Sequence, residues 1–351
     1  TLEQVAWSFP LQGRLRAKGE WSMKKIIASL IIIGLLLTPL AGCKQTARPV
    51  PDDKLTEVTV LLDWLPNTNH TGLYVAKDKG YFKAEGLEVE LLQPGEGGTS
   101  QLLAAGKGDF GISYQEEMTV ARSEDIPVVA LAAIIQHNTS GFASPVEKEI
   151  KSPADFAGKT YGGWGSPAET AMIKALMEKY GADFNQVNMV NIGSADFFTS
   201  MHKGIDFSWI YWGWTGIEAE QRDMDLNFIK LRDENDALDF YTPVIIASES
   251  KLKGHPELAE KFLRACSKGY EFAVKHPEEA GEILLKSVPD LDRDLVMASQ
   301  KYLAQEYQAD APRWGEMKQE VWQKYADFMY ENKLIKKNID PAQAFTNKYL
   351  P

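Results

Sequence analysis

The sequence predicts an α/β fold with mixed, mostly parallel sheets that are covered by helices on both faces. Two stretches of the chain, one beginning at residue 58 and one near Ser144, alternate short β-branched or apolar runs with helical patterns. Residues 255–332 then carry long amphipathic helical patterns. Repeated strand–helix alternation is typical of βαβ units, whose crossover helices cover both faces of a parallel sheet. With 44% hydrophobic and 25% charged residues, the composition is that of an ordinary globular protein.

The first alternation opens with a strand at 58–62 and a helix that begins at Thr71 and ends before Gly80. The strand run contains no turn residue, and glycine favours the end of a helix. The elements expected next are a turn at 81–86, strands at 88–92, 110–114 and 128–135, and helices at 101–105 and 116–122. A glycine-rich turn at 95–100 precedes the first of these helices. We expect Thr99 or Ser100, at the end of this turn, to cap that helix beside a cleft. The alternative is a plain surface turn.

The second alternation is expected to contain strands at 160–162, 187–190 and 207–212, helices at 168–180 and 195–203, and a helix after Gly216. The tail returns to an apolar strand at 244–247. Helices are expected after it at 255–275, 277–286, 291–307 and 314–332. In the last of them Trp314, Trp322, Tyr325 and Phe328 recur at helical spacing, which indicates core packing rather than chemistry.

Polar and aromatic side chains gather where the first strand turns into the first helix. Asp63 and Trp64 follow the strand, and Asn69 and His70 precede the helix. In open α/β sheets, ligands lie at the carboxyl ends of strands and against helix N-termini. The turn is therefore predicted to bind a ligand, and the alternative is a polar turn around a buried tryptophan.

The first 54 residues are predicted to lie outside the globular part. A basic segment at Met23 is followed by an apolar run at 26–37 and by Leu-Ala-Gly before Cys43. This arrangement resembles a lipoprotein signal peptide, so we expect residues 1–22 to be an untranslated upstream extension and 23–42 a signal peptide. Cys43 would then be lipidated and 43–54 would form a tether. The alternative is a cleaved secretory signal with a chance cysteine.

Charge and cysteine content exclude several classes of protein. The net charge of −11 does not favour nucleic acid, because binding to phosphate backbones needs cationic patches. The sequence has two cysteines, and Cys266 recurs with apolar residues at helical spacing, which indicates a core thiol. None of the five histidines lies at i,i+4 spacing from another or beside a cysteine. We therefore expect no metal site and no cofactor.

Three segments carry a resemblance to a known family. They read Asp-Trp-Leu-Pro-Asn-Thr-Asn-His-Thr-Gly at 63–72, Tyr-Val-Ala-Lys-Asp-Lys-Gly-Tyr-Phe-Lys-Ala-Glu-Gly-Leu at 74–87 and Leu-Leu-Ala-Ala-Gly-Lys-Gly-Asp-Phe-Gly-Ile-Ser at 102–113. With these segments the chain resembles the solute-binding proteins of ABC importers, and within them the group that binds thiamin pyrimidine precursors. The resemblance covers about residues 55–350.

The resemblance implies a two-lobe periplasmic-binding-protein-like fold of type II, with a hinge and a ligand cleft between the lobes. The lobes are expected at 55–141 plus 243–351 and at 142–242. The implied ligand is a small aminopyrimidine, N-formyl-4-amino-5-aminomethyl-2-methylpyrimidine. The implied partners are the permease subunits of an ABC importer, together with the membrane through the lipid anchor alone.

A flat aminopyrimidine needs aromatic walls for stacking and a carboxylate that accepts from its amine. We expect Trp64 or Tyr114 as one wall and Trp212 or Trp214 as the other, since residues 212 and 214 share a face if the strand at 207–212 continues. As the carboxylate that binds the ligand, we favour Glu169 and Glu117 over Asp63. The alternative for Asp63 is that it caps its own turn. The candidate ligand-binding residues are Asp63, Trp64, Asn69, His70, Tyr114, Gln115, Glu117, Trp164, Gly165, Glu169, Trp212, Trp214 and Tyr241.

Two rival interpretations stay open. The first is an enzyme, the pyrimidine synthase of thiamin biosynthesis that shares the implied fold, although its cysteine-rich motif is missing here. The second keeps a binding function with another ligand: hydroxymethylpyrimidine, riboflavin, taurine or an alkylsulfonate. A sulfonate site would favour arginine or a ring of helix N-termini, whereas the candidates here are acidic and aromatic.

Overall fold

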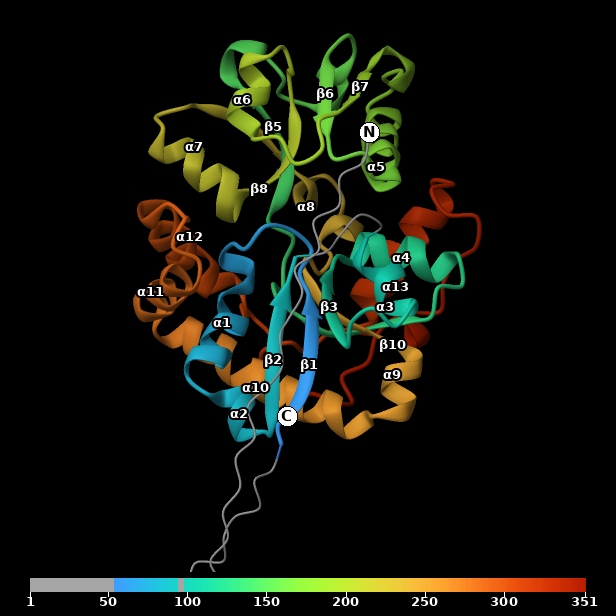
Figure 1. Ribbon diagram of the computed structural model, residues 1–351. Coiled ribbons are helices and arrows are strands. Elements are labelled where there is room, and N and C mark those ends of the chain that lie inside the picture. Colours follow the sequence, from blue (N-terminus) through green and yellow to red (C-terminus); the bar gives the residue numbers. More distant parts are fainter. Residues whose placement is uncertain (1–53, 94–97) are drawn as a thin grey trace, which may run out of the picture. The chain divides into compact units, whose positions relative to one another are not determined.

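The computed structural model describes residues 54–93 and 98–351 (Figure 1). The expected upstream extension, the signal peptide, Cys43 and nearly all of the tether lie outside the described residues, as does part of the glycine-rich turn. Within the described ranges, no helix is both long and apolar enough to cross a membrane.

The larger sheet has five strands in the order β2-β1-β3-β10-β4. Its strands are β1 (Thr56–Leu61), β2 (Leu87–Leu92), β3 (Phe110–Ser113), β4 (Val128–Ala133) and β10 (Val244–Ser248). β1 runs parallel to β2 and β3, whereas β10 returns from the far end of the chain and pairs antiparallel with β3 and β4. Strands from both ends of the sequence therefore make one sheet.

Side chains of this sheet alternate between two cores, as the period of a strand requires. Val58 and Val60 of β1 face one core, and Leu61 faces the other. The first core also receives apolar side chains from α1 (Thr71–Asp78), α2 (Tyr81–Ala84), α9 (Glu249–Gly254), α10 (Pro256–Lys275), α11 (Pro277–Ser287) and α12 (Arg293–Glu306). The second receives them from α3 (Thr99–Ala104), α4 (Gln115–Ser123), α13 (Gln319–Glu331) and α14 (Pro341–Ala344). Both faces are thus covered, as expected.

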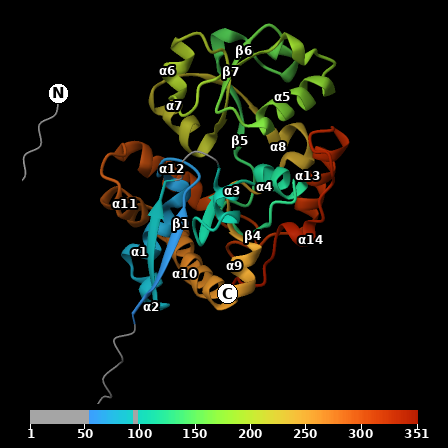
Figure 2. The ribbon, with the colours of Figure 1, turned by 45° about the vertical axis from the view of Figure 1, so that its right-hand side comes forward.

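The second lobe contains two smaller sheets, visible above the first sheet in Figures 1 and 2. One has the order β8-β5-β9 and is antiparallel, and the other pairs β6 with β7 in parallel. Their strands are β5 (Ser140–Pro145), β6 (Thr160–Gly163), β7 (Asn188–Asn191), β8 (Ser208–Tyr211) and β9 (Leu226–Lys230). The helices of this part are α5 (Pro167–Lys179), α6 (Phe197–His202), α7 (Ile217–Gln221) and α8 (Leu231–Glu234). Its core includes the rings of Phe156 and Phe207, stacked with centroids 4.2 Å apart.

The chain crosses between the lobes twice, from β4 to β5 and from α8 back to β10. The expected boundaries at 141/142 and 242/243 stay a prediction, and β5 begins two residues before the first of them. α13 packs against both lobes, because Trp322 lies in a core of the first sheet while Tyr325 lies in the core of the second lobe. Short 3₁₀ turns occur at Thr68–His70 (η1), Val146–Lys148 (η2), Pro153–Phe156 (η3), Phe184–Gln186 (η4) and Asp236–Leu238 (η6).

The structure corrects several local expectations. β8 ends at Tyr211, and Trp212–Gly216 forms a π-helical turn (η5), so the argument that strand alternation puts Trp212 and Trp214 on one face is wrong. α13 starts at Gln319 rather than at 314, and Trp314 instead stacks from a preceding loop on Tyr270, with centroids 4.4 Å apart.

Other differences concern strands and caps. β5 and β9 were not expected, and β5 carries Ser, Gly and Pro, which are turn residues by composition. The sheets are mixed, but antiparallel pairs are more frequent than expected, because β10 and β5 each pair antiparallel on both sides. The expected hydroxyl cap of α3 is wrong, since Gly98 stands at that position and no side chain caps the helix.

The contact between α1 and α10 gives a stability prediction. A Cβ added to Gly72 would collide with the ring of Tyr270, whereas one added to Gly254 of α9 meets nothing. Overpacking of this kind costs about 1–3 kcal/mol. We expect Gly72→Ala to lower the free energy of unfolding by that amount in denaturant titrations, and Gly254→Ala to change it by less than about 1 kcal/mol. Equal stability of the two variants would contradict the packing described.

Candidate functional site

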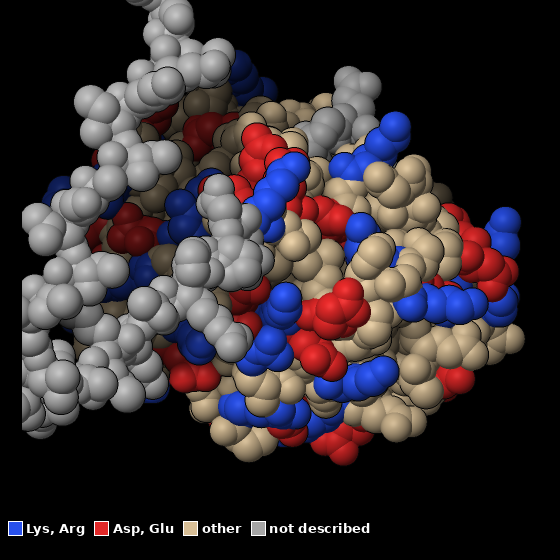
Figure 3. All heavy atoms as spheres, turned by 60° about the horizontal axis from the view of Figure 1, so that its bottom comes forward, with Lys and Arg blue, Asp and Glu red and all other residues tan. Residues whose placement is uncertain are grey.

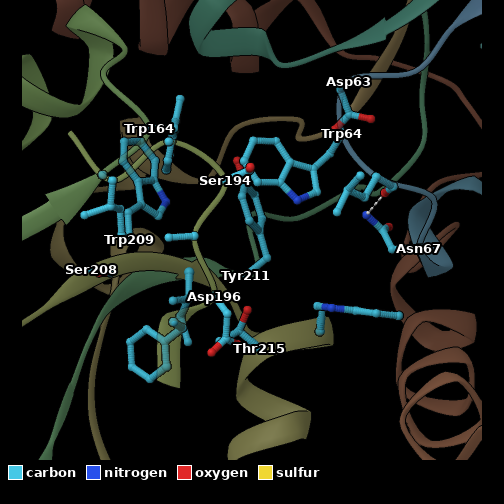
Figure 4. Close-up of a pocket in the computed structure, with 18 of the residues that line it drawn as sticks. Asp63, Trp64, Asn67, Trp164, Ser194, Asp196, Ser208, Trp209, Tyr211 and Thr215 are labelled. Atoms are coloured by element: carbon cyan, nitrogen blue, oxygen red, sulfur yellow. Dashed lines mark hydrogen bonds between the residues drawn. The ribbon is translucent and has the colours of Figure 1, made fainter. Parts of the chain in front are cut away.

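A cavity of about 480 Å³ lies between the two lobes. Its lining comes from β3, β6 and β8 and from the segments that follow β1, β2, β3, β6, β7 and β8, at the carboxyl ends of these strands. In α/β proteins this is where ligands bind. Figure 4 shows Asp63, Trp64 and Asn67 from the first lobe facing Trp164, Trp209 and Ser194 from the second.

Asp63 is held by two donors at the edge of this cavity. Its Oδ1 is 2.7 Å from His70 Nε2, and its Oδ2 accepts from the Tyr114 hydroxyl. The backbone N–H of Asn67 donates to His70 Nδ1 at 3.2 Å, which leaves Nε2 as the nitrogen that carries a proton toward Asp63. The carboxylate therefore ties the end of β1 to η1 and to the end of β3.

These contacts set the protonation of the group. Burial by itself raises the pKa of Asp63, but His70 and the hydroxyl of Tyr114 outweigh it and hold the pKa below its ordinary value. Burial, and then the negative charge of Asp63, raise the pKa of Tyr114 well above its ordinary value. At neutral pH the pair is thus an ionised carboxylate with a neutral phenol that donates to it.

Aromatic side chains form the walls of the cavity. Trp64, 40% exposed, extends into the cavity from the first lobe (Figure 4). Trp164 and Trp209 lie opposite it, and the centroids of these two rings are 5.6 Å from each other. Tyr114 and Tyr211 stack across the two lobes with centroids 6.1 Å apart and an interplanar angle of 22°. An exposed indole facing two others leaves a slot that suits a planar ring.

The charge of the lining is one-sided. Four carboxylates line the cavity, those of Asp63, Glu117, Asp196 and Glu218, and no Lys, Arg or His does so within residues 54–93 and 98–351. The outer face around α9 and α10 differs from this lining, because charged residues of both signs are interspersed there (Figure 3). A cavity of this kind suits a ligand that offers donors or a positive charge.

Glu117 differs from the other three carboxylates. Asp196 accepts from the backbone of Thr199 at 2.7 Å and Glu218 accepts from Arg222 at 2.6 Å, while Glu117 has no hydrogen-bond or ion-pair partner in the described part of the chain. Burial first, and then the charges of Asp63 and Glu169, raise the pKa of Glu117 to about 7.

Seven of the expected site residues line the cavity: Asp63, Trp64, Asn69, Tyr114, Glu117, Trp164 and Trp214. The buried His70 touches the site only through Asp63. Gln115 and Tyr241 are also buried and bond to each other, because the backbone N–H of Tyr241 donates to Gln115 Oε1 at 2.9 Å.

The remaining three expected residues lie outside the lining. Glu169 is buried and accepts from the backbone of Trp164 and Ser166 at 3.1 and 2.7 Å, as the N3 residue of a capping box at the start of α5. Trp212 packs on Phe228, with centroids 4.8 Å apart. Gly165 has φ of +87° in the loop before α5, a conformation that glycine favours.

Trp209 and Tyr211 line the cavity but are not among the expected residues, and their only sequence signal is the crowding of aromatics at 209–214. The loop at 192–196 also lines the cavity, and nothing in the sequence distinguishes it from a surface turn. Cys266 is buried in α10 and burial raises the pKa of its thiol well above the ordinary value, so it is the expected core thiol. No group of three or more potential metal-ligating side chains was found in the described ranges.

Two lobes with a cavity at their strand ends define a periplasmic binding protein fold. The solved structure of the alkanesulfonate-binding protein SsuA from Xanthomonas axonopodis pv. citri, bound to MOPS, has the same fold, with a TM-score of 0.64 and 13% identity over 84% of this chain and 99% of that one. The chain belongs to the family described as NMT1/THI5 like, whose model matches residues 67–280.

Relatives carry several functional names. The chain is 29% identical to the formylaminopyrimidine-binding protein of Halalkalibacterium halodurans, over 91% of this chain and 98% of that one. It is 25% identical to the 4-amino-5-hydroxymethyl-2-methylpyrimidine phosphate synthase of Legionella pneumophila, over 84% and 93%. It is 26% identical to the riboflavin-binding protein RibY of Chloroflexus aurantiacus, over 90% and 92%.

The pairing of Asp63 gives a pH-dependent prediction. A folded-state pKa below the ordinary 3.8 means that the ionised group stabilises the fold above pH 3.8, and that this contribution is lost as pH falls through the folded value. We expect Asp63→Asn to lower the free energy of unfolding by about 1–3 kcal/mol at pH 7, with a deficit that shrinks below pH 3.8. Denaturant titrations at several pH values measure this, with the exposed Asp290→Asn as control. A deficit independent of pH would contradict the assignment.

Proposed function

We propose that this protein is an extracytoplasmic binding protein that captures a thiamin pyrimidine precursor, N-formyl-4-amino-5-aminomethyl-2-methylpyrimidine, for import by an ABC permease. The observation that carries the proposal is the cavity between the lobes, which the described residues line with aromatic walls and carboxylates but with no Lys, Arg or His. The name of the Halalkalibacterium relative, which aligns along nearly its whole length, supports the same ligand class.

The chemistry of the ligand matches the two features of the lining. An aminopyrimidine is planar, so it can stack on Trp64 on one side and on Trp164 or Trp209 on the other. Stacking of aromatic pairs contributes about 0.5–1.5 kcal/mol beyond the burial of area. Its exocyclic amine donates hydrogen bonds, and a bond from such a donor to a carboxylate contributes about 1.5–3 kcal/mol. Glu117 is the carboxylate best suited to this contact because it has no other partner among the described residues.

Ligands of other charge fit the lining less well. A sulfonate carries a negative charge, which four lining carboxylates would repel. The isoalloxazine of riboflavin is a larger, neutral ring system that brings no positive charge to the carboxylates. Hydroxymethylpyrimidine has the same ring and amine as the formylated compound, so it is the second candidate ligand.

The enzyme alternative draws support from the relatives named as synthases. The cysteine-rich motif of the pyrimidine synthase is missing from the sequence, and Cys266 is buried in α10 and does not line the cavity. The buried thiol, with its raised pKa, is poorly suited to nucleophilic attack. The carboxylate and aromatic lining is accounted for by binding alone, so we favour a binding function.

The experiment that tests the proposal is calorimetric titration of the purified chain with formylated aminopyrimidine, hydroxymethylpyrimidine, riboflavin and taurine. We expect the two pyrimidines to bind and taurine not to bind. Trp64→Ala should weaken pyrimidine binding by about 5–100-fold, because it removes one wall of the slot. The exposed Tyr330→Ala, outside the lining, serves as the control variant. Binding of taurine alone, or turnover of any titrated compound, would refute the proposal.

We also propose that Cys43 carries a lipid that holds the protein at the membrane beside its permease. The support is the lipoprotein-like sequence before this cysteine. Expression in a bacterium that is fed radioactive palmitate should label the chain and bring it to the membrane fraction. Cys43→Ala should abolish the label and leave pyrimidine binding unchanged. Label that persists in the variant would exclude this anchor.

A further inference from the structure

The four lining carboxylates are not equivalent, and the difference indicates how the ligand is recognised. Asp63, Asp196 and Glu218 each already accept hydrogen bonds from the protein. Glu117, in the first turn of α4, lines the cavity and has no such partner in residues 54–93 and 98–351. A half-buried carboxyl group without a partner is costly unless it is protonated or meets a ligand.

The groups around Glu117 oppose its ionisation. Asp63 faces it from the end of β1 and Glu169 from the start of α5, and both are carboxyl groups. The phenols of Tyr114 and Tyr211 also lie near it, from the ends of β3 and β8. Its neighbour Glu116 is buried with both side-chain oxygens unpartnered. No Lys, Arg or His of residues 54–93 and 98–351 lines the cavity to offset the carboxylates, so a proton or a positively charged ligand would do so.

Resting on the proposed function, we propose that Glu117 and the bound aminopyrimidine share a single proton across two hydrogen bonds. One carboxyl oxygen accepts from the exocyclic amine, and the proton lies between the other oxygen and the ring nitrogen beside that amine. The pair is either a carboxylic acid with a neutral ring or a carboxylate with a protonated ring. Both forms hold one proton and the same two hydrogen bonds, so selection depends on the basicity of the ring.

The proton count of this pair determines how affinity changes with pH. Above the pKa of both groups, free Glu117 and free ligand hold no proton, so binding takes up one. Affinity then falls about tenfold per pH unit. Below the pKa values of both groups, free Glu117 and free ligand together hold two protons and the complex holds one. Binding then releases one proton, so affinity decreases as the pH is lowered further. Because the pKa of Glu117 is about 7, the upper limb of this profile begins near neutral pH.

Glu117→Gln separates the shared proton from a merely structural role. The amide presents a carbonyl to the amine and an N–H to the ring nitrogen, so it can bind the neutral ring without a proton. Above pH 7.5 we expect the variant's affinity to be constant within about twofold, whereas the unaltered chain loses about tenfold per pH unit. Glu117→Asp keeps the carboxyl group and should keep proton uptake, even with weaker binding.

The experiment is calorimetry of hydroxymethylpyrimidine binding at pH 8.5 in buffers of different ionisation enthalpy, which counts the protons taken up. We expect about one proton per ligand for the unaltered chain and none for Glu117→Gln. Glu124→Gln is the control, because Glu124 follows α4 and is exposed outside the cavity. Binding without proton uptake, or equal uptake in Glu117→Gln, would overturn the shared proton and leave the proposed function standing. Failure of the unaltered chain to bind either pyrimidine would overturn both.

Discussion

The site depends on Asp63, whose two carboxylate oxygens each accept one hydrogen bond. Its two oxygens fix His70 and Tyr114, which belong to different strand ends, and Trp64 follows it directly in the sequence. The same region is held from below by the hydroxyl of Tyr270, which donates to the backbone oxygen of Asn69 at 2.8 Å. This part of the cavity lining is therefore held in place by the protein's own hydrogen bonds, and preorganisation of this kind lowers the cost of binding.

The distribution of charge follows from that arrangement. The donors to Asp63 outweigh burial and lower its pKa, whereas burial and then the charge of Asp63 raise the pKa of Glu117. The pKa values of two carboxyl groups in one cavity are thus shifted in opposite directions by their surroundings, a way in which binding sites divide roles between similar side chains. Asp63 holds three segments of the protein together, whereas Glu117, which has no partner among the described residues, is the carboxyl group that our proposal assigns to the ligand.

The layered fold and the first turn of the site were predictable, because alternating apolar runs and strand-end polar residues have direct physical meanings. Trp209 and Trp212 were harder to distinguish, since β8 ends at Tyr211 and the π-helical turn that follows removes Trp212 from the strand alternation. Glu169 carries a sequence signal for helix capping, because Ser166 precedes it by three residues, the spacing of a capping box. The loop at 192–196 reaches the cavity only through tertiary packing, which a single sequence does not reveal.

Fold similarity alone leaves the ligand open, because the cavity lies at strand ends whose side chains vary independently of the sheets. A sulfonate-binding protein and this chain share their architecture, yet a sulfonate and an aminopyrimidine need opposite charge around them. The sheets require only that apolar side chains alternate along each strand. Glu117 and Trp64 lie outside the strands, so this requirement does not determine them. The lining of the cavity, rather than the fold, therefore carries the information about the ligand, and that lining is acidic and aromatic.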